Sequence, residues 1–334
     1  MTRPYVQINA SNQIVALRQH LQTLLPRFIS FPGVLGITLN GGLSRGYGDH
    51  LSEIDVTFYL TPETFAAWHS GKSPLALGIT VIDGQLYDIK VVDYIAECER
   101  DWEEVALWDA SYAETLYDPD NLVQELFAQK LGADPDPGRA EALLMRCWWY
   151  FELAGEIWIH REDALQGHHM FNQAVTALVE ALFVANGETI PHEKWLLHMS
   201  RSLAWRPVNW ERRLSAGMST GDLSVESLRA RQEVIRDLWQ EVDGTIIEKH
   251  YPHLPVHVMQ KTAYEQLKLL VDEGSMPVAE WRAQTAGDVP NGDPFHAIIR
   301  IDEGRIILDR QVLLADENKE LYAWHYAVLQ AVLE

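Results

Sequence analysis

The sequence predicts an α+β protein in which a domain of interleaved strands and helices is followed by a helical domain. Up to about residue 130, segments that alternate apolar and polar residues are separated by segments of helical periodicity. Residues 131–140, LGADPDPGRA, are rich in Pro, Gly and Asp and predict a domain boundary. Helical periodicity prevails beyond it. We therefore expect domains over 1–135 and 136–334.

The first domain is expected to begin with a helix. Residues 12–28 place five apolar side chains on one helical face: Ile14, Leu17, Leu21, Leu24 and Leu25. Residues 53–60, EIDVTFYL, alternate apolar and polar side chains, which predicts a half-buried strand. The other elements expected here are a strand at 33–39, a hairpin at 77–94 around Asp83-Gly84, a short strand at 114–121 and a helix from Leu122.

The second domain is expected to be built of helices. Their predicted ranges are 141–160, 169–186, 192–203, 224–249 and 256–272. Residues 297–309 are compatible with a small hairpin around Glu303-Gly304, and residues 321–333 with a closing helix.

The charge balance restricts the partners. A formal net charge of −21 argues against nucleic acid, whose phosphates need a basic surface. It is compatible with a small cationic partner, or with a nucleotide whose charge a metal carries. Two distant cysteines, in no CxxC spacing, indicate no disulfide framework and no zinc knuckle. The N-terminus lacks the apolar core of a signal peptide and no apolar run reaches membrane length, so we expect a cytoplasmic protein without membrane contact.

Residues 39–60 carry the main functional signal. Four glycines precede Glu53 and Asp55, which project from the same strand face at positions i and i+2. Asp88 lies on a later strand that could run beside this one, on one face with Lys90. Three carboxylates on one sheet face repel one another unless a cation lies between them. Mg²⁺ prefers oxygen ligands and commonly keeps a substrate phosphate in its shell. The pattern therefore predicts a metal and a phosphate.

The glycine-rich loop is a candidate for binding that phosphate. Gly41 and Gly42 allow close approach of the backbone, while Ser44 adds a hydroxyl and Arg45 a cation. Two other phosphate motifs do not fit. Residues 41–46 match GxxxxG, but Tyr47 and Gly48 follow where a P-loop needs Lys and Ser or Thr, and the GxGxxG dinucleotide fingerprint is absent.

These residues resemble the nucleotidyltransferase superfamily that includes DNA polymerase beta. Gly41-Gly42, ten intervening residues and the acid-x-acid pair Glu53-Ile54-Asp55 match its pattern, and Asp88 matches its third carboxylate. The string GGLSRGYGDHLSEID is similar to the antibiotic-modifying branch, which includes aminoglycoside and lincosamide nucleotidyltransferases. The resemblance implies a mixed sheet with flanking helices. Gly42 stands where many members have Ser, and Glu53 where many have Asp.

Residues 161–196 resemble the helical domain of the same relatives. The matching residues are Phe183, Asn186, Pro191, Lys194 and Trp195. The resemblance covers roughly residues 15–200 and does not extend to the last hundred.

The resemblance implies a Mg²⁺-dependent transfer of a nucleoside monophosphate, AMP from ATP, to a hydroxyl of a small molecule such as an aminoglycoside-like antibiotic. Glu53 and Asp55 would hold one or two Mg²⁺, and Asp88 would share a metal or act as general base. Gly41, Gly42, Ser44 and Arg45 would cradle the phosphates, and Lys194 would reach the triphosphate from the helical domain. Acids such as Glu152, Glu156 and Asp163 are candidates, by position alone, for contact with a cationic acceptor.

Two alternatives stay open from the sequence. The acceptor hydroxyl could belong to a protein, as in adenylylating regulators or toxin–antitoxin partners. The chain could also be a nucleotide-binding sensor that has lost catalysis, which the two departures at Gly42 and Glu53 favour and the presence of all three acids opposes.

Overall fold

A computed structural model of the chain describes residues 4–132, 136–285, 298–309, 328 and 331–332. The chain divides into two compact units, residues 1–135 with 187–204 and residues 136–186 with 205–334. The first division falls inside the predicted boundary segment. The segment 187–204 differs from expectation, because the sequence predicts it within the helical domain and the structure includes it in the first unit. The closing helix expected over 321–333 lies largely outside the described residues.

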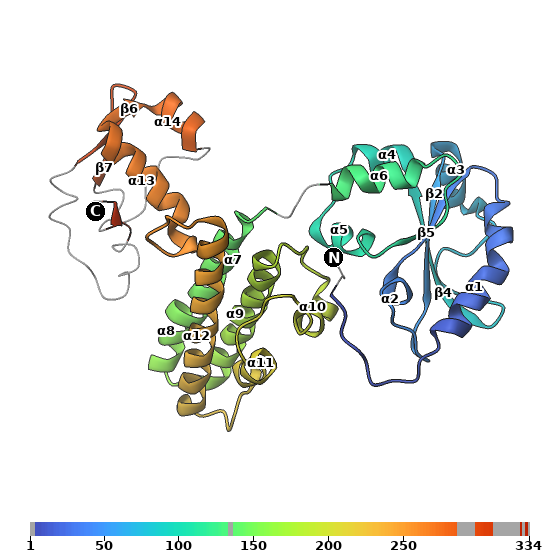
Figure 1. Ribbon diagram of the computed structural model, residues 1–334, viewed down its shortest axis with the longest axis horizontal. Helices are drawn as coiled ribbons and strands as arrows, with labels where there is room; N and C mark the ends of the chain where they lie inside the picture. Colours follow the sequence, from blue (N-terminus) through green and yellow to red (C-terminus); the bar gives the residue numbers. More distant parts are fainter. Residues whose placement is uncertain (1–3, 133–135, 286–297, 310–327, 329–330, 333–334) are drawn as a thin grey trace. The chain divides into compact units, whose positions relative to one another are not determined.

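The first unit contains a five-stranded mixed sheet (Figure 1). Its order is β3-β4-β2-β1-β5, and all neighbours are antiparallel except β2 and β4, which are parallel. The strands span Val34–Leu39 (β1), Ile54–Leu60 (β2), Gly78–Ile82 (β3), Gln85–Asp93 (β4) and Glu114–Tyr117 (β5). The parallel pair places Asp55 opposite Asp88, so the two carboxylates that the sequence assigns to one face do share it.

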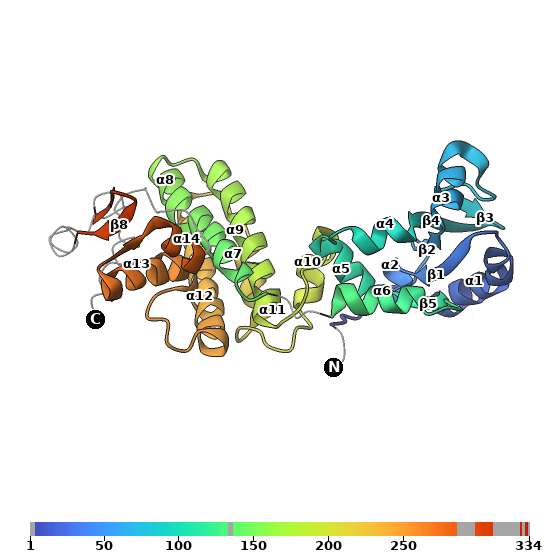
Figure 2. The same ribbon diagram turned by 90° about the horizontal axis from the view of Figure 1, so that it is seen from above.

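Helices cover both faces of this sheet. The helix α1 (Ile14–Ile29) packs its apolar face on the side that carries Ile54, Val56 and Phe58. On the other side, α4 (Tyr94–Glu99) and α6 (Leu122–Leu131) pack around Tyr59. Figures 1 and 2 show α1 on one side of the sheet and α4 and α6 on the other. The prediction that β2 is half-buried is therefore wrong. All seven of its residues are buried, because it is a central strand with helices on both faces.

Several short elements of the first unit have no counterpart in the sequence prediction. They are α2 (Gly41–Ser44), α3 (Pro62–Ala67) with the π-helical turn Trp68–Lys72, α4 and α5 (Glu104–Ala110). Each spans about two helical turns or fewer, which is too short for a helical period to stand out from the sequence. The helix α10 (Glu193–Ser200) was expected, and it belongs to this unit.

The second unit is mainly a helical bundle. Its long helices are α7 (Arg139–Trp148), α9 (Ala164–Ala185) and α12 (Val225–His250), which pack against one another. A π-helical turn, Trp149–Leu153, continues α7 into α8 (Ala154–His160). The helix α11 (Trp210–Met218) was not predicted. The core is apolar except for residues such as Arg231, whose guanidinium donates to the carbonyl oxygens of Gly217 and His168.

The last part of the second unit contains a small sheet. The 3₁₀ turn Val258–Gln260 leads into α13 (Lys261–Glu273). The strands β7 (Ile299–Asp302) and β8 (Arg305–Leu308) form the hairpin expected around Glu303-Gly304, and β6 (Ser275–Pro277) adds a third antiparallel strand that the sequence did not predict. The helix α14 (Val278–Thr285) packs here through Trp281, which is fully buried.

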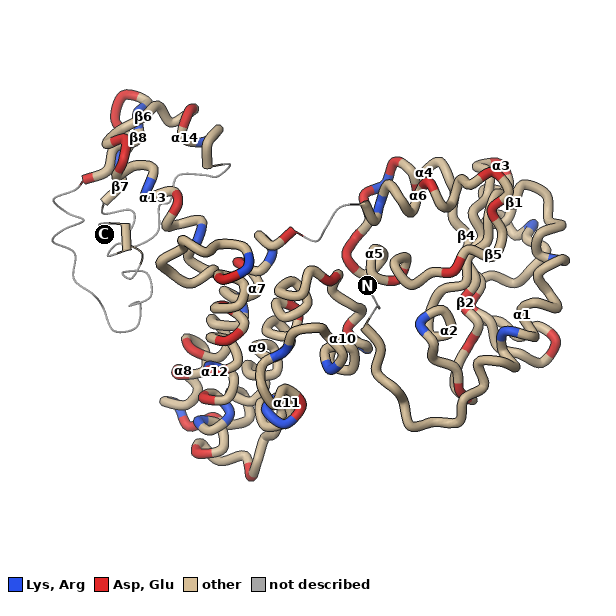
Figure 3. Tube along the Cα trace, in the orientation of Figure 1, with Lys and Arg blue, Asp and Glu red and all other residues tan. Residues whose placement is uncertain are grey.

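Figure 3 shows acidic residues on elements of both units, so neither unit alone carries the negative charge. Within the described residues, no helix is both long enough and apolar enough to cross a membrane.

Candidate functional site

The glycine-rich loop lies directly against the start of β2. Gly41 has φ +67°, in the region that favours glycine. A Cβ atom at Gly41 would lie 1.8 Å from Oδ2 of Asp55, which leaves no room for any side chain. The backbone N–H of Asn40 also donates to the Asp55 carbonyl oxygen at 2.9 Å. The loop and the second acid of the pair are therefore in direct contact, although thirteen residues lie between Gly41 and Asp55.

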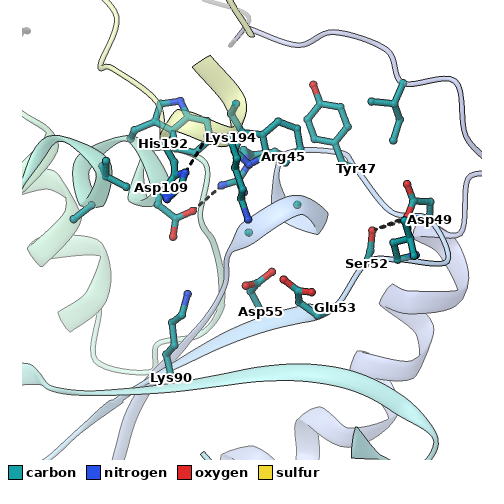
Figure 4. A pocket seen from close by; sticks show the side chains of 18 of the residues that line it. Arg45, Tyr47, Asp49, Ser52, Glu53, Asp55, Lys90, Asp109, His192 and Lys194 are labelled. Atoms are coloured by element: carbon teal, nitrogen blue, oxygen red, sulfur yellow. Dashed lines mark hydrogen bonds and ion pairs between the residues drawn. The ribbon is translucent and has the colours of Figure 1, made fainter. Parts of the chain in front are cut away.

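Both acids of the pair line a pocket of the first unit. Glu53 and Asp55 project together beneath the glycine loop (Figure 4). Asp55 is only 8% exposed, whereas Glu53 is half-buried just before the strand. The shared face and the shared pocket are what the i, i+2 spacing predicts.

Asp88 lies on the neighbouring strand, but its carboxylate has a partner. Its Oδ2 lies 3.3 Å from Nζ of Lys90. Lys90 and Asp55 line the pocket, whereas Asp88 is not among the lining residues. The sequence analysis assigned Lys90 to the face of Asp88 without giving it a role. The structure brings its ammonium into the pocket from the strand below the acid pair (Figure 4).

Asp55 is held in an environment that disfavours its charged form. Burial raises its pKa from 3.8 to about 6. The Lys90 ammonium opposes this rise, and the negative charges of Glu53, Asp88 and Asp109 add to it. A buried carboxylate among other carboxylates is stabilised by any cation that enters the pocket. Such a cluster of carboxylates favours the binding of a divalent cation.

The pocket has a volume of about 530 Å³, within the usual range for small-molecule sites. Its lining comes from the glycine loop, β2, β4, α5 and α10. Among the lining residues are Gly41, Gly42, Arg45, Glu53, Asp55, Lys90, Trp108, Asp109, His192, Lys194 and Trp195. Of the phosphate-binding residues that the sequence predicts, Ser44 is not in this lining, and its hydroxyl donates to the Gly41 carbonyl oxygen at 3.1 Å.

Arg45 lines the pocket, but its guanidinium is already engaged. Its Nη1 donates to Oδ1 of Asp109 at 2.6 Å, and its side chain is 4% exposed. The guanidinium carbon lies 4.5 Å from the ring centre of Trp108 and 5.2 Å from that of Trp195. These contacts favour a structural role for Arg45 within the pocket wall over the phosphate contact that the sequence suggested.

The segment 187–204 brings α10 to this pocket. The chain leaves the second unit after Asn186 and re-enters it at Trp205. The Asn186 side chain closes the base of this excursion, because it bonds both the N–H and the carbonyl of Trp205, at 2.8 and 3.0 Å. Farther along, the Ile190 N–H donates to Oε1 of Glu104 at 2.7 Å. Lys194 is thereby held over the pocket of the first unit, into which its side chain extends (Figure 4).

Stacked rings secure α10 and the N-terminal segment. Tyr47 stacks on Trp195 at 4.8 Å and on Tyr5 at 5.0 Å between ring centres. The Tyr47 hydroxyl donates to the Val6 carbonyl oxygen at 2.9 Å, and Nε2 of His198 lies 3.1 Å from the same oxygen. The two histidines of this segment therefore have structural contacts, since His192 also accepts a bond from the Lys194 N–H at the start of α10.

The three acids suggested for a cationic acceptor have partners within the second unit. Glu152 pairs with Arg236 at 2.9 Å, and Glu156 accepts a bond from Gln232 at 3.1 Å. Asp163 caps the start of α9 by accepting from the Gln166 N–H. These contacts account for all three acids as structural residues of the bundle.

The metal site stays a prediction. Among the described residues, no three His, Cys, Asp or Glu side chains are arranged to hold an ion as they stand. Glu53 and Asp55 fit Mg²⁺ by donor chemistry, since both are carboxylates in one pocket and the charge on Asp55 is disfavoured without a cation. Asp88 shares their face but is bound to Lys90.

Lys90, Trp108 and Asp109 are among the pocket residues that sequence reasoning missed. Lys90 carried a signal, because it follows Asp88 by two residues on an alternating strand. Trp108 and Asp109 carried none, because they lie on α5, a helix too short to be predicted.

Comparison with known proteins does not assign this chain to a family. No protein-family model matches the sequence, and no curated protein matches it. The crystal structure of a nucleotidyltransferase-like protein from Exiguobacterium sibiricum is similar over 85% of this chain and 93% of that one, with 10% sequence identity and a TM-score of 0.40. A likeness at that level does not establish a shared activity, so function has to be argued from the site itself.

The contact between Gly41 and Asp55 yields a first prediction. Gly41→Ala should lower the free energy of unfolding by about 1–3 kcal/mol, because it adds backbone strain and forces the Asp55 carboxylate to move. Chemical denaturation measures this change. Gly42→Ala is the matched control, since a Cβ there meets its nearest atom at an ordinary 3.5 Å. Equal stability of the two variants would contradict the predicted contact.

The raised pKa of Asp55 yields a second prediction. The contribution of Asp55 to the free energy of unfolding is most favourable below pH 3.8, where the acid is protonated in the folded and the unfolded protein. That contribution is lost as the pH rises through about 6, so ionised Asp55 destabilises the fold by about 3 kcal/mol above that pH. Asp55→Asn should therefore be more stable than the wild type by about 1–3 kcal/mol at pH 8 without metal. The difference should shrink towards pH 4.5.

Denaturation at both pH values in the presence of a chelator tests this expectation. Glu63→Gln, a change at an exposed acid of α3, controls for the general loss of one negative charge. A less stable Asp55→Asn at pH 8 would show that the carboxylate is not held against its charge.

Proposed function

We propose that the chain is a Mg²⁺-dependent nucleotidyltransferase that transfers a nucleoside monophosphate, AMP from ATP, to the hydroxyl of a small molecule. The observation that carries the proposal is the contact between the glycine turn and the acid pair. Gly41 lies so close to Asp55 that a phosphate held by the loop would be next to both carboxylates. Anion binding and cation binding at adjoining places are what a nucleotide with its metal requires.

The phosphates are assigned to the loop and to α10. The backbone of Gly41 and Gly42 lines the pocket without side chains in the way. Lys194 supplies the cation for the triphosphate, since its side chain is exposed and extends into the pocket, whereas Arg45 is bound to Asp109. Support for Lys194 comes from α10, which the contacts of Ile190 and Trp195 hold in place.

The metal is assigned to Glu53 and Asp55, with Asp88 as a third ligand or as the general base. When bound, Mg²⁺ supplies charge stabilisation for the triphosphate and its pyrophosphate leaving group. The acceptor oxygen forms a bond to the α-phosphorus while the bond to the β-phosphate oxygen breaks, and a carboxylate accepts the hydroxyl proton. Asp88 has the exposure for that proton transfer, with a side chain that is 20% exposed beside the pocket acids.

Replacing the acid pair tests the proposal directly. Glu53→Ala with Asp55→Ala should lower Mg²⁺-dependent pyrophosphate release by at least about a thousandfold, because both assigned metal ligands are lost. Release is measured with each of the four nucleoside triphosphates, with and without a panel of aminoglycosides and lincosamides. Lys72→Met, at an exposed lysine, is the control.

Turnover that survives in the double variant would rule out the mechanism. Wild-type protein that binds ATP without releasing pyrophosphate under any condition of the panel would favour a protein acceptor or a silent sensor instead.

The departure at Gly42 yields a separate prediction. A side chain fits there, because the nearest atom to an added Cβ is the Tyr47 carbonyl oxygen at 3.5 Å. Gly42→Ser should tighten ATP binding by about threefold to tenfold, because a hydroxyl becomes available to a charged phosphate. Isothermal titration calorimetry with ATP and Mg²⁺ measures this. Gly42→Ala separates the hydroxyl from the added carbon, and equal affinities of the two variants would place the phosphates away from this loop.

A further inference from the structure

Lys90 is the cation of the pocket that lies among its carboxylates. The parallel register of β2 and β4 puts Lys90 opposite Thr57, one step beyond the pair Asp55 and Asp88 on the same face. Its Nζ lies 3.3 Å from Oδ2 of Asp88, and the side chain is half exposed, towards the pocket. Figure 4 shows the ammonium below Asp109 and to one side of Asp55.

The other two cations in the pocket lining do not serve the acids in this way. Arg45 is bound to Asp109 between two indole rings. Lys194 is exposed and comes from α10, on the opposite wall from β4. Lys90 is thus the side chain that counters the charge on the acid face of the sheet.

The mutual electrostatics agree with that placement. The Lys90 ammonium is the favourable charge acting on Asp55, against the negative charges of Glu53 and Asp88. Burial lowers the pKa of Lys90. The carboxylates of Asp88, Asp55 and Asp109 together raise it by more, so the net shift of the Lys90 pKa is upward. The lysine therefore stays charged in the pocket.

We propose that Lys90 is an internal counter-ion that occupies the acid site of the metal-free protein and competes with the divalent ion for the oxygens of Asp55 and Asp88. The inference rests on the proposed function for the role of these acids. A positive charge beside the ligands lowers the affinity for a free divalent ion, since like charges repel. A nucleotide brings the metal with negative phosphates, which Lys90 attracts. The residue thus makes the site bind the metal–nucleotide complex in preference to the metal alone.

The test is metal affinity rather than activity. Mn²⁺ binding to the full chain, without nucleotide, is followed by electron paramagnetic resonance for the wild type and Lys90→Met, whose side chain keeps a similar length. Lys90→Met should bind Mn²⁺ about threefold to tenfold more tightly than the wild type. Lys90→Arg, which keeps the charge, should stay close to the wild type, and Lys72→Met controls for loss of an exposed lysine outside the pocket lining.

Thermal unfolding provides a second readout that does not depend on Mn²⁺ resonance. Without metal, Lys90→Met should unfold at a lower temperature than the wild type, because the acids lose their counter-ion. Mn²⁺ should raise its midpoint by more than it raises that of the wild type. Unchanged or weaker Mn²⁺ binding by Lys90→Met, or an unchanged metal-free midpoint, would overturn the inference.

Failure of the inference and failure of the proposed function give different results. If the wild type binds Mn²⁺ and loses it in the Glu53→Ala, Asp55→Ala variant, the metal site holds, and the Lys90 comparison alone decides the inference. If neither the wild type nor Lys90→Met binds Mn²⁺, or if the double acid variant still binds it, the metal assignment and the inference both fall.

Discussion

The wall of the pocket depends on the guanidinium of Arg45, which lies between Trp108 and Trp195 and is bound to Asp109. This one group joins the end of the glycine loop, the short helix α5 and the helix α10. A buried guanidinium is stable only when it is paired, and here the partner acid and both rings come from other elements. The Nε of Arg45 is buried and has no hydrogen-bond partner among the described residues, because the two indole rings enclose the guanidinium.

That arrangement places the acid pair and Lys194 on opposite walls of the pocket. The acids are on the sheet, where the parallel pairing of β2 and β4 aligns Asp55 with Asp88. Lys194 reaches the pocket from α10, which Trp195 holds by stacking on Tyr47. A pocket with carboxylates and Lys90 on one side and Lys194 on the other suits a ligand that is itself a metal paired with an anion. Burial of Asp55 disfavours its charged form until a cation enters the pocket.

Because residues 187–204 belong to the first unit, the whole pocket lies in that unit. A single side chain, Asn186, closes the base of this excursion through both backbone groups of Trp205, so eighteen residues can leave the helical bundle and return to the same place. All residues that line the pocket then belong to the first unit. The acids Glu152, Glu156 and Asp163, by contrast, make structural contacts within the second unit.

The sequence alone determined the α+β class, the strands at β1, β2 and β4, the glycine turn and the shared face of Glu53 and Asp55, whereas the parallel pairing of β2 and β4 decided that Asp88 joins that face. The sequence could do so because strand alternation and glycine chemistry are local properties. Only the tertiary structure decided that β2 is buried on both faces, that Arg45 is bound to Asp109, and that Lys90 lies among the acids. Those outcomes depend on which elements pack together, and α5 and the return of residues 187–204 have no local pattern that predicts them.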